Sequence, residues 1–274
     1  MGQADVASRA VELPRSLGSL KLSTKRCRGG NVIDRFRTSG ATKVAFPRRV
    51  DAVEAIILNT SGGLTGGDRF EATATAGPKT RLVLTTQAAE RAYRSRSGRA
   101  RVSTRLDVGD GATLHWLPQE LIVFDGAAIE RRLDIHLAPL AEAVIVEPIV
   151  FGRRAMGETR ISGTFRDRIT LSRNGTPIYR DRIDLSGPIA DRLDRPAIAG
   201  GMTAVATILY CGSAAELHLP KLRALLPSSG GASIVAPGLL ILRLLAEDAF
   251  LLRKTLVPLL ECLSGAALPK SWSL

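Results

Sequence analysis

The sequence contains few of the residue types that most often carry catalytic or metal chemistry. Of 274 residues, three are histidines, three are cysteines and 4% are aromatic. The cysteines lie far apart without a CxxC pair, so neither a disulfide scaffold nor a structural zinc site is expected. The histidines have no metal partner four residues away and no nearby nucleophile elbow, so we expect structural roles for them and no histidine-based hydrolase machinery. These residues are Cys27, Cys211, Cys262, His115, His136 and His218.

Long apolar runs are also missing. No uninterrupted stretch reaches membrane-spanning length, and Met1–Pro14 lacks the apolar segment of a secretory signal. We therefore expect a cytoplasmic protein with reduced thiols and no membrane association.

The charge balance is strongly basic. Lysine and arginine number 38 against 26 acidic residues, a formal net charge of +12, and only seven of the 38 are lysines. The densest cluster lies between Arg91 and Arg105 and contains one aromatic residue, Tyr93. Nucleic-acid binders interleave aromatics for base stacking, so we expect no nucleic-acid partner. An acidic protein partner suits arginine better, although a solvated basic surface without a partner remains an alternative.

Alternating apolar and polar residues dominate the first two hundred positions. This period of two is typical of half-buried strands, and turn signals such as Asn174-Gly175 separate the runs. With no long helix between them, a βαβ plan is not expected. The predicted fold is mostly β, a large antiparallel sheet or β-helicoid-like body. The predicted strands are Ser19–Lys25, Glu54–Leu58, Arg69–Ala76, Thr80–Thr86, Arg101–Val108, Ala112–Leu117, Leu121–Phe124, Ile129–Leu137, Ala143–Val150, Thr164–Ser172, Ile178–Leu185 and Thr203–Cys211.

Helical patterns occur late in the chain. Ser213–Leu226 starts with a candidate N-cap serine and has leucines at helical spacing. Glu247–Ser264 begins with acids, ends at Gly265 and contains Pro258, which predicts a kink. Gly238–Ala246 is ambiguous and is read as a buried strand. We expect one β-rich domain over residues 18–265, flanked by flexible segments at 1–17 and 266–274.

A glycine-rich turn, Asn59–Phe70, connects two of the predicted strands. Its four glycines precede Asp68, which stands where a phosphate-binding loop has lysine, so phosphate binding is excluded. Other carboxylates also stand at strand ends or beside turns. If they line a shared interior, they need arginines, water or a cation as partners. The candidate acids are Asp68, Glu120, Asp125, Glu147 and Glu158, and the turn glycines are Gly62, Gly63, Gly66 and Gly67.

Four segments together resemble the urease accessory protein family UreD, also called UreH. They match, in order, the family's GGxxGGD, TTQAA…YR, LPQE…FDGA and E…GR..MGE patterns, within a similarity that runs from about Gly18 to Leu263. Two positions depart from the family: Glu90-Arg91 replaces a frequent Thr-Lys pair, and Asn59-Thr60-Ser61 replaces frequent prolines. Besides the glycines and acids above, the matching residues are Thr85, Thr86, Gln87, Tyr93, Arg94, Gln119, Gly152 and Arg153.

The resemblance implies an activation chaperone and not an enzyme. Family members have a mostly β fold with two helices. They bind apo-urease, a helical accessory protein (UreF-like) and a GTPase accessory protein (UreG-like), and help deliver nickel to the urease active site. The resemblance implies no permanently bound cofactor, only transient Ni²⁺.

Our hypothesis is that the five candidate acids include residues that line a transient Ni²⁺ path. Oxygen ligands hold a divalent ion more weakly than imidazole or thiolate sets, and weak binding suits an ion that must leave again. A second hypothesis assigns the two late helices to docking the helical accessory protein. A β-rich small-molecule hydrolase or ligand-binding protein is the main alternative, and a basic nucleic-acid-binding protein is a weaker one.

Overall fold

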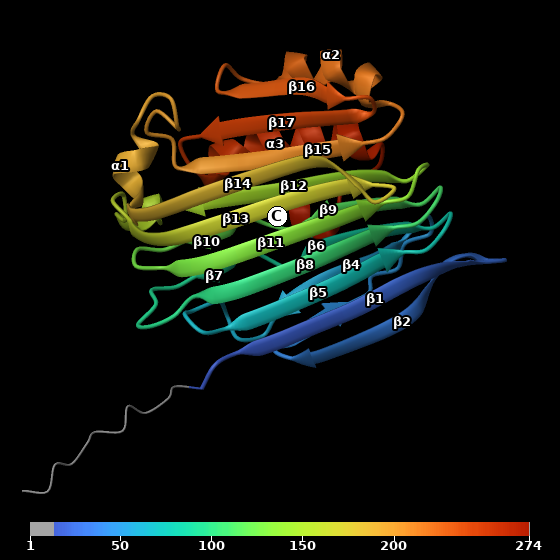
Figure 1. Ribbon diagram of the computed structural model, residues 1–274, viewed down its shortest axis with the longest axis horizontal. Helices are drawn as coiled ribbons and strands as arrows, with labels where there is room; N and C mark the ends of the chain where they lie inside the picture. The colour runs from blue at the N-terminus through green and yellow to red at the C-terminus, as the bar shows by residue number, and fades with distance from the viewer. Residues whose placement is uncertain (1–13, 274) are drawn as a thin grey trace, which may run out of the picture.

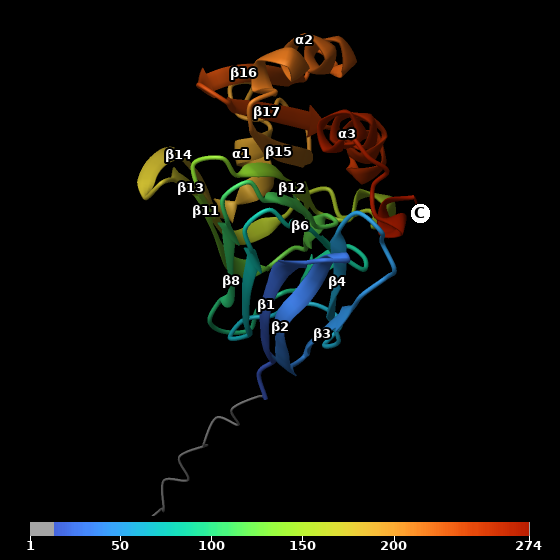
Figure 2. The ribbon, with the colours of Figure 1, turned by 90° about the vertical axis from the view of Figure 1, so that its right-hand side faces the viewer.

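Two β-sheets face each other and a layer of helices covers the outer side of one of them. The computed structural model describes residues 14–273. Figure 1 shows the strands rising in chain order from β1 and β2 toward β17, and Figure 2 shows α2 and α3 at the C-terminal end of the stack. The mostly-β, helicoid-like body predicted from the sequence is confirmed.

The first sheet has seven strands. In spatial order they are β14 (Thr176–Pro188), β13 (Ser162–Arg173), β11 (Ala128–Leu137), β8 (Ala100–Val108), β5 (Arg69–Ala76), β1 (Leu17–Cys27) and β2 (Gly30–Gly40).

The second sheet has ten strands. Eight follow one path: β16 (Gly230–Ala236), β17 (Leu239–Ala246), β15 (Ala204–Cys211), β12 (Glu142–Phe151), β9 (Thr113–Leu117), β6 (Arg81–Thr86), β4 (Val53–Asn59) and β3 (Thr42–Ala45). Two short strands, β10 (Leu121–Val123) and β7 (Glu90–Ala92), extend it beside β12.

The prediction of antiparallel pairing is wrong for the centre of both sheets. The run β1–β5–β8–β11–β13 is parallel, and so is the run β4–β6–β9–β12. Antiparallel pairs stand at the margins, for example β1–β2 and β13–β14. From β4 to β13 the chain passes repeatedly between the sheets, so a strand of the opposite sheet serves as the crossover that usually needs a helix. Alternation with a period of two is the same in both pairings, so it could not report this winding.

Both late helices are confirmed. Helix α2 spans Ala215–Leu225 and α3 spans Ala249–Ser264. Asp248 caps α3 by accepting a hydrogen bond from the Leu251 amide at 2.8 Å, and Gly265 ends the helix in the left-handed conformation. The predicted serine cap of α2 is wrong, because its N-cap is Ala214 and makes no side-chain cap bond.

Several elements of the structure were not predicted from the sequence. These are β2, β3, β7, β16, helix α1 (Ile189–Leu193) and the 3₁₀ turns η1 (Arg154–Met156) and η2 (Lys270–Trp272). The strand predicted at Gly238–Ala246 is β17.

The structure describes the C-terminal segment more fully than the N-terminal one. Residues 1–13, most of the segment expected to be a flexible N-terminus, lie outside the described residues. At the other end, where a flexible tail was expected, Trp272 is buried and donates from Nε1 to the Leu117 carbonyl at 3.0 Å. This terminal turn therefore packs against the second sheet.

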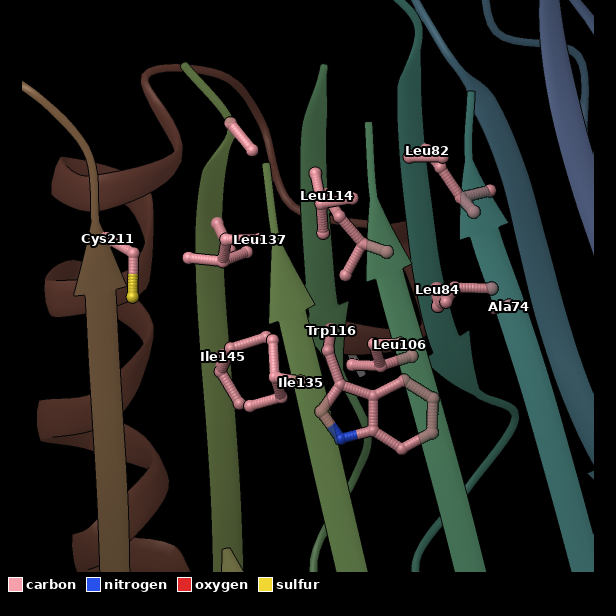
Figure 3. Close-up of a cluster of buried hydrophobic side chains, with 14 of the residues drawn as sticks. Ala74, Leu82, Leu84, Leu106, Leu114, Trp116, Ile135, Leu137, Ile145 and Cys211 are labelled. Carbon is pink, nitrogen blue, oxygen red and sulfur yellow. The ribbon is translucent and has the colours of Figure 1, made fainter. Parts of the chain in front are cut away.

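Apolar side chains fill two interfaces. One set lies between the sheets, where Leu84, Leu106, Trp116 and Ile135 point from neighbouring strands into a shared interior (Figure 3). Another lies between the second sheet and the helices and includes most of the buried face of α3. Within residues 14–273, no helix is long and apolar enough to cross a membrane.

Candidate functional site

A cavity of about 140 Å³ lies between the two sheets, beside the apolar interior. Residues of both sheets line it: Phe70, Val102 and Leu133 come from the first, and Ile57 and Leu121 from the second. Most of its wall is apolar. Ten of its twenty lining residues nevertheless carry polar or charged side chains, and the positions of these groups define its chemistry.

Three charged side chains converge in this cavity from three different strands. Arg131 lies on β11, Glu147 on β12 and Asp167 on β13. The Arg131 guanidinium reaches Glu147 at 2.8 Å through one terminal nitrogen and Asp167 at 2.6 Å through the other. Both acids are buried, and the Arg131 side chain is 14% exposed. We call these residues the charged triad.

Each triad residue takes a position that an apolar side chain would otherwise occupy. Along β11 the inward positions are Ile129, Arg131, Leu133, Ile135 and Leu137, because side chains alternate between the two faces of a strand. The same alternation places Glu147 between Ile145 and Ile149, and Asp167 between Phe165 and Ile169. A charge in an inward register position was the signal that could have identified Arg131 and Asp167, both of which the sequence reading missed.

The environment of Glu147 alters its acidity. Burial raises the pKa of Glu147, and the nearby Arg131 guanidinium and the Trp116 indole N–H oppose that rise. The indole nitrogen donates to Glu147 Oε1 at 2.6 Å. Glu90, on the same cavity wall, also has its pKa raised by burial, while Asn59 donates to its carboxylate at 3.1 Å. The cavity thus contains carboxylates whose proton affinity exceeds that of exposed acids.

Gln119 joins the cavity to the helix layer. It is buried, lines the cavity and accepts a 2.6 Å hydrogen bond at Oε1 from Arg253 of α3. Because arginine can only donate, this bond fixes the amide orientation and directs Nε2 away from Arg253. Arg253 also lies 3.7 Å from Glu120 and donates to the carbonyls of Ser271 and Trp272. The predicted acid Glu120 therefore stands beside the cavity wall and does not line it.

Asp125 and Glu158 lie together at the loop end of the sheets, away from the triad. They share a surface hollow with Tyr93, Arg94 and Arg153. Arg94 forms an ion pair with Asp125, and the Asp125 amide donates to Glu158 at 3.1 Å.

Arg153 organises the other side of this hollow. It donates to both Glu158 oxygens, at 3.0 and 3.1 Å, and its guanidinium lies 4.1 Å above the Phe124 ring. The hydrogen bond from Arg153 lowers the pKa of Glu158. Gly152, with φ of +86°, supplies the backbone turn before it.

Asp68 clamps the glycine-rich loop. Its buried carboxylate accepts hydrogen bonds from the Ser16 amide at 2.9 Å and the Thr65 amide at 2.8 Å. The loop glycines permit close approach, since a Cβ on Gly63 would meet the Tyr93 ring at 2.3 Å and one on Gly66 would meet Ser95 Oγ at 1.9 Å. Of the five candidate acids, only Glu147 lines the cavity between the sheets.

The matching motif residues on β6 and after it hold the strand ends together. Thr85 donates to the Leu117 carbonyl at 2.7 Å, and Thr86 Oγ1 accepts from the Gln119 amide at 2.9 Å. Gln87 is exposed, and its backbone N–H donates to the Ile57 carbonyl. These contacts fix the Leu117–Gln119 segment against the cavity.

The described histidines and cysteines form no metal-binding group. Burial lowers the pKa of His115 to about 3 and raises that of the Cys211 thiol to about 12. Among residues 14–273, no group of three or more His, Cys, Asp or Glu side chains is placed to hold a metal ion. The triad carries its own counter-ion in Arg131.

Comparison with known proteins assigns the family. The model of the UreD urease accessory protein family matches residues 16–273. A urease accessory protein UreD of Roseobacter denitrificans is 47% identical over 96% of this chain and 97% of its own length. Those of Ruegeria pomeroyi and Agrobacterium fabrum are 44% and 43% identical, with at least 93% of each chain covered. With 96% of its length aligned to a relative that shares nearly half of its residues, the chain belongs to the UreD family of urease accessory proteins.

Proposed function

We propose that this protein is a non-catalytic urease maturation factor that binds apo-urease and helps deliver Ni²⁺ to its active site. The observation that carries the proposal is the charged triad, in a cavity between the sheets of a UreD family member. A buried ion triad adds little stability compared with apolar residues of similar volume. Its presence at inward strand positions, where apolar side chains would pack, is therefore better explained by function than by folding.

The cavity chemistry suits a passing divalent ion. Glu147 and Asp167 present oxygen atoms, and Arg131 neutralises one of their two charges. A cation that entered would meet oxygen donors in competition with a resident guanidinium, so it would be held weakly and released again. We propose Glu147 as the central residue of the path, with Glu90 and Asp167 as further donors.

We propose roles for the other four sequence-predicted acids from their positions in the structure. Asp125 and Glu158 lie in the surface hollow at the loop end, where their arginine partners would have to move for them to bind an ion. Glu120 stands beside Gln119 and Arg253, and Asp68 holds the glycine-rich loop. We propose the first three as candidates for the ends of the path, while Asp68 would act by keeping the loop in place.

The test is nickel-dependent activation of apo-urease by the Glu147→Gln variant. Glutamine keeps the acceptor for Trp116 but removes the charge, so we expect loss of activation with normal complex formation. The matched control is Glu54→Gln, since Glu54 is also buried and paired with an arginine, Arg49, at 3.0 Å, but lies outside the cavity wall. Equal activation by both variants, with equal binding of urease, would remove Glu147 from the path.

We also propose that the helix layer docks a helical accessory protein (UreF-like), with a GTPase (UreG-like) joining the same assembly. Phe250 of α3 and Leu217 of α2 are 73% and 76% exposed, so each helix presents a large apolar side chain to solvent. Deleting the chain from Glu247 would not test this idea, because α3 also covers the core of the second sheet.

Surface variants separate docking from folding. We expect Leu217→Asp with Phe250→Asp to abolish co-purification with the helical accessory protein. Leu140→Asp is the control, because Leu140 is 70% exposed in the turn after β11. Retained binding by the double variant would refute the assignment.

The proposed place of action is the cytoplasm. Cys27, Cys211 and Cys262 are all free thiols, which suits a reducing compartment.

A further inference from the structure

The outer face of the seven-stranded sheet carries a row of arginines in register. Alternate residues of each strand point toward the outer face of the sheet. On three adjacent strands these positions align as Arg132 of β11, Arg168 of β13 and Arg182 of β14. All three side chains are exposed. In Figure 1 these strands lie side by side on the face toward the viewer.

This row is unfavourable for the sheet by itself. Like charges directly opposite each other on neighbouring strands repel. Arg132 and Arg182 each form an ion pair with the aspartate two residues later, Asp134 and Asp184 respectively. Arg168, in the middle, forms no ion pair within residues 14–273. The molecule thus keeps an uncompensated arginine between two others, which a purely structural surface would not require.

The row belongs to a wider basic hollow. A depression of about 580 Å³ on this face is lined by five arginines and two aspartates, together with His136 and Thr170. We call the five arginines the arginine belt: Arg105, Arg132, Arg168, Arg180 and Arg182. Of the arginine cluster noted in the sequence, Arg105 lines this hollow, whereas Arg91 lies on β7 and Arg94 to Arg99 lie in the loop before β8.

We propose that the arginine belt is a docking surface for a protein partner whose contacting face is rich in carboxylates. The guanidinium group presents donors in a planar fork that matches a carboxylate. Strands about 4.8 Å apart place successive forks at a spacing that several side-chain carboxylates can meet. Binding would also relieve the repulsion within the row.

Two features favour an acidic protein over a nucleic acid. No Phe, Tyr or Trp side chain lines the hollow, so base stacking could use only the single His136 ring there. Asp134 and Asp181 lie among the arginines and would repel a continuous phosphate backbone, whereas a protein surface of mixed charge can place a basic residue against them. This inference rests on sheet register and charge and does not depend on the nickel role.

The test uses the full chain and two charge-matched double variants. Arg168→Glu/Arg180→Glu changes the belt without removing an observed ion-pair partner from any acid. Arg48→Glu/Arg195→Glu makes the same change of net charge at exposed positions elsewhere. Binding of a fluorescent decaglutamate peptide and of a ten-nucleotide single-stranded RNA is measured by anisotropy over a range of salt concentrations.

We expect the natural chain to bind the peptide with an affinity that falls as salt rises. The belt variant should lose at least tenfold in affinity, and the control variant less than threefold. Equal losses in the two variants, or no peptide binding at low salt, would overturn the proposal. Tighter binding of the RNA, lost in the belt variant, would overturn it in favour of a nucleic acid. Circular dichroism checks folding, and Arg168→Gln/Arg180→Gln, with a smaller expected loss, replaces the belt variant if reversal prevents folding.

Discussion

The interior between the two sheets has two parts that are built from the same strands and differ in character. In one, Ile135, Leu137 and Ile145 close the space with aliphatic contacts (Figure 3). In the other, two to four residues away along β11 and β12, Arg131 and Glu147 stand in a cavity. The first part is what a stable sheet packing requires. The second costs desolvation energy that better packing would avoid, so we interpret the aliphatic part as the source of stability and the charged part as the functional site.

The largest expected effect comes from breaking the charged triad on one side. Arg131→Met leaves Glu147 and Asp167 buried without their cation, and we expect a loss of about 3–5 kcal/mol in the free energy of unfolding at neutral pH. Burial already raises the pKa of Glu147 in the folded protein, and removing Arg131 would raise it further. A raised folded-state pKa means that protonation favours folding, so the deficit should shrink as pH falls from neutral through that raised value. Urea unfolding at several pH values measures this, and a deficit that grows toward acid pH would contradict it.

Truncating a side chain in the aliphatic part should lower the free energy of unfolding nearly as much but leave urease activation unchanged. Ile135 is completely buried, and Ile135→Ala is expected to lower the free energy of unfolding by about 2–5 kcal/mol through lost burial and a residual void. Urease activation per folded molecule should stay normal below the unfolding temperature. Reduced activation by fully folded Ile135→Ala would break the division between the two parts.

Trp116 lies at the boundary between the two parts. Its ring packs in the aliphatic cluster, while its indole nitrogen donates to Glu147. Trp116→Phe removes that donor and some buried area, and we expect a loss of about 2 kcal/mol. The absence of this donor should also raise the pKa of Glu147, so the deficit should be smaller at acid pH. A deficit independent of pH would indicate that only packing was lost.

The smallest expected change in stability comes from replacing the whole triad. The variant Arg131→Met/Glu147→Gln/Asp167→Leu removes all three charges together and keeps an acceptor for Trp116. We expect its free energy of unfolding to lie within about 1 kcal/mol of the natural chain, or above it. Nickel-dependent activation of urease should nevertheless be lost. A stable triple variant with full activity would show that the charged part is dispensable.

The sequence predicted the strands better than it predicted their partners. The bounds of β5 follow from local alternation, because that pattern depends on one buried face alone. Strands β4, β6 and β9, whose buried residues are consecutive, were predicted to within one residue at each end. Pairing depends on contacts with strands about 30 residues away, such as Phe70 with Val102, and local patterns do not contain that information. Strand β2 was missed because its side chains are mostly exposed and leave no apolar alternation to detect.

The candidate site was predicted only in part for a related reason. Glu147 was identified as an acid beside Pro148 at a strand position, and it lines the cavity. Arg131 and Asp167 were missed because each looks like an exception within an apolar alternation. Their significance appears only when β11, β12 and β13 bring the three charges together.

The winding of the chain between two sheets determines the order in which its strands unfold locally. Each central strand pairs in its sheet with the strands one circuit before and one circuit after it, as in repeat proteins whose units contact only their neighbours. Structure should therefore be lost circuit by circuit from the margins. Amide hydrogens of β2 and β16, each an edge strand of its sheet at opposite ends of the stack, should exchange with solvent first. Those of β8 and β9, which have a circuit on either side, should exchange last.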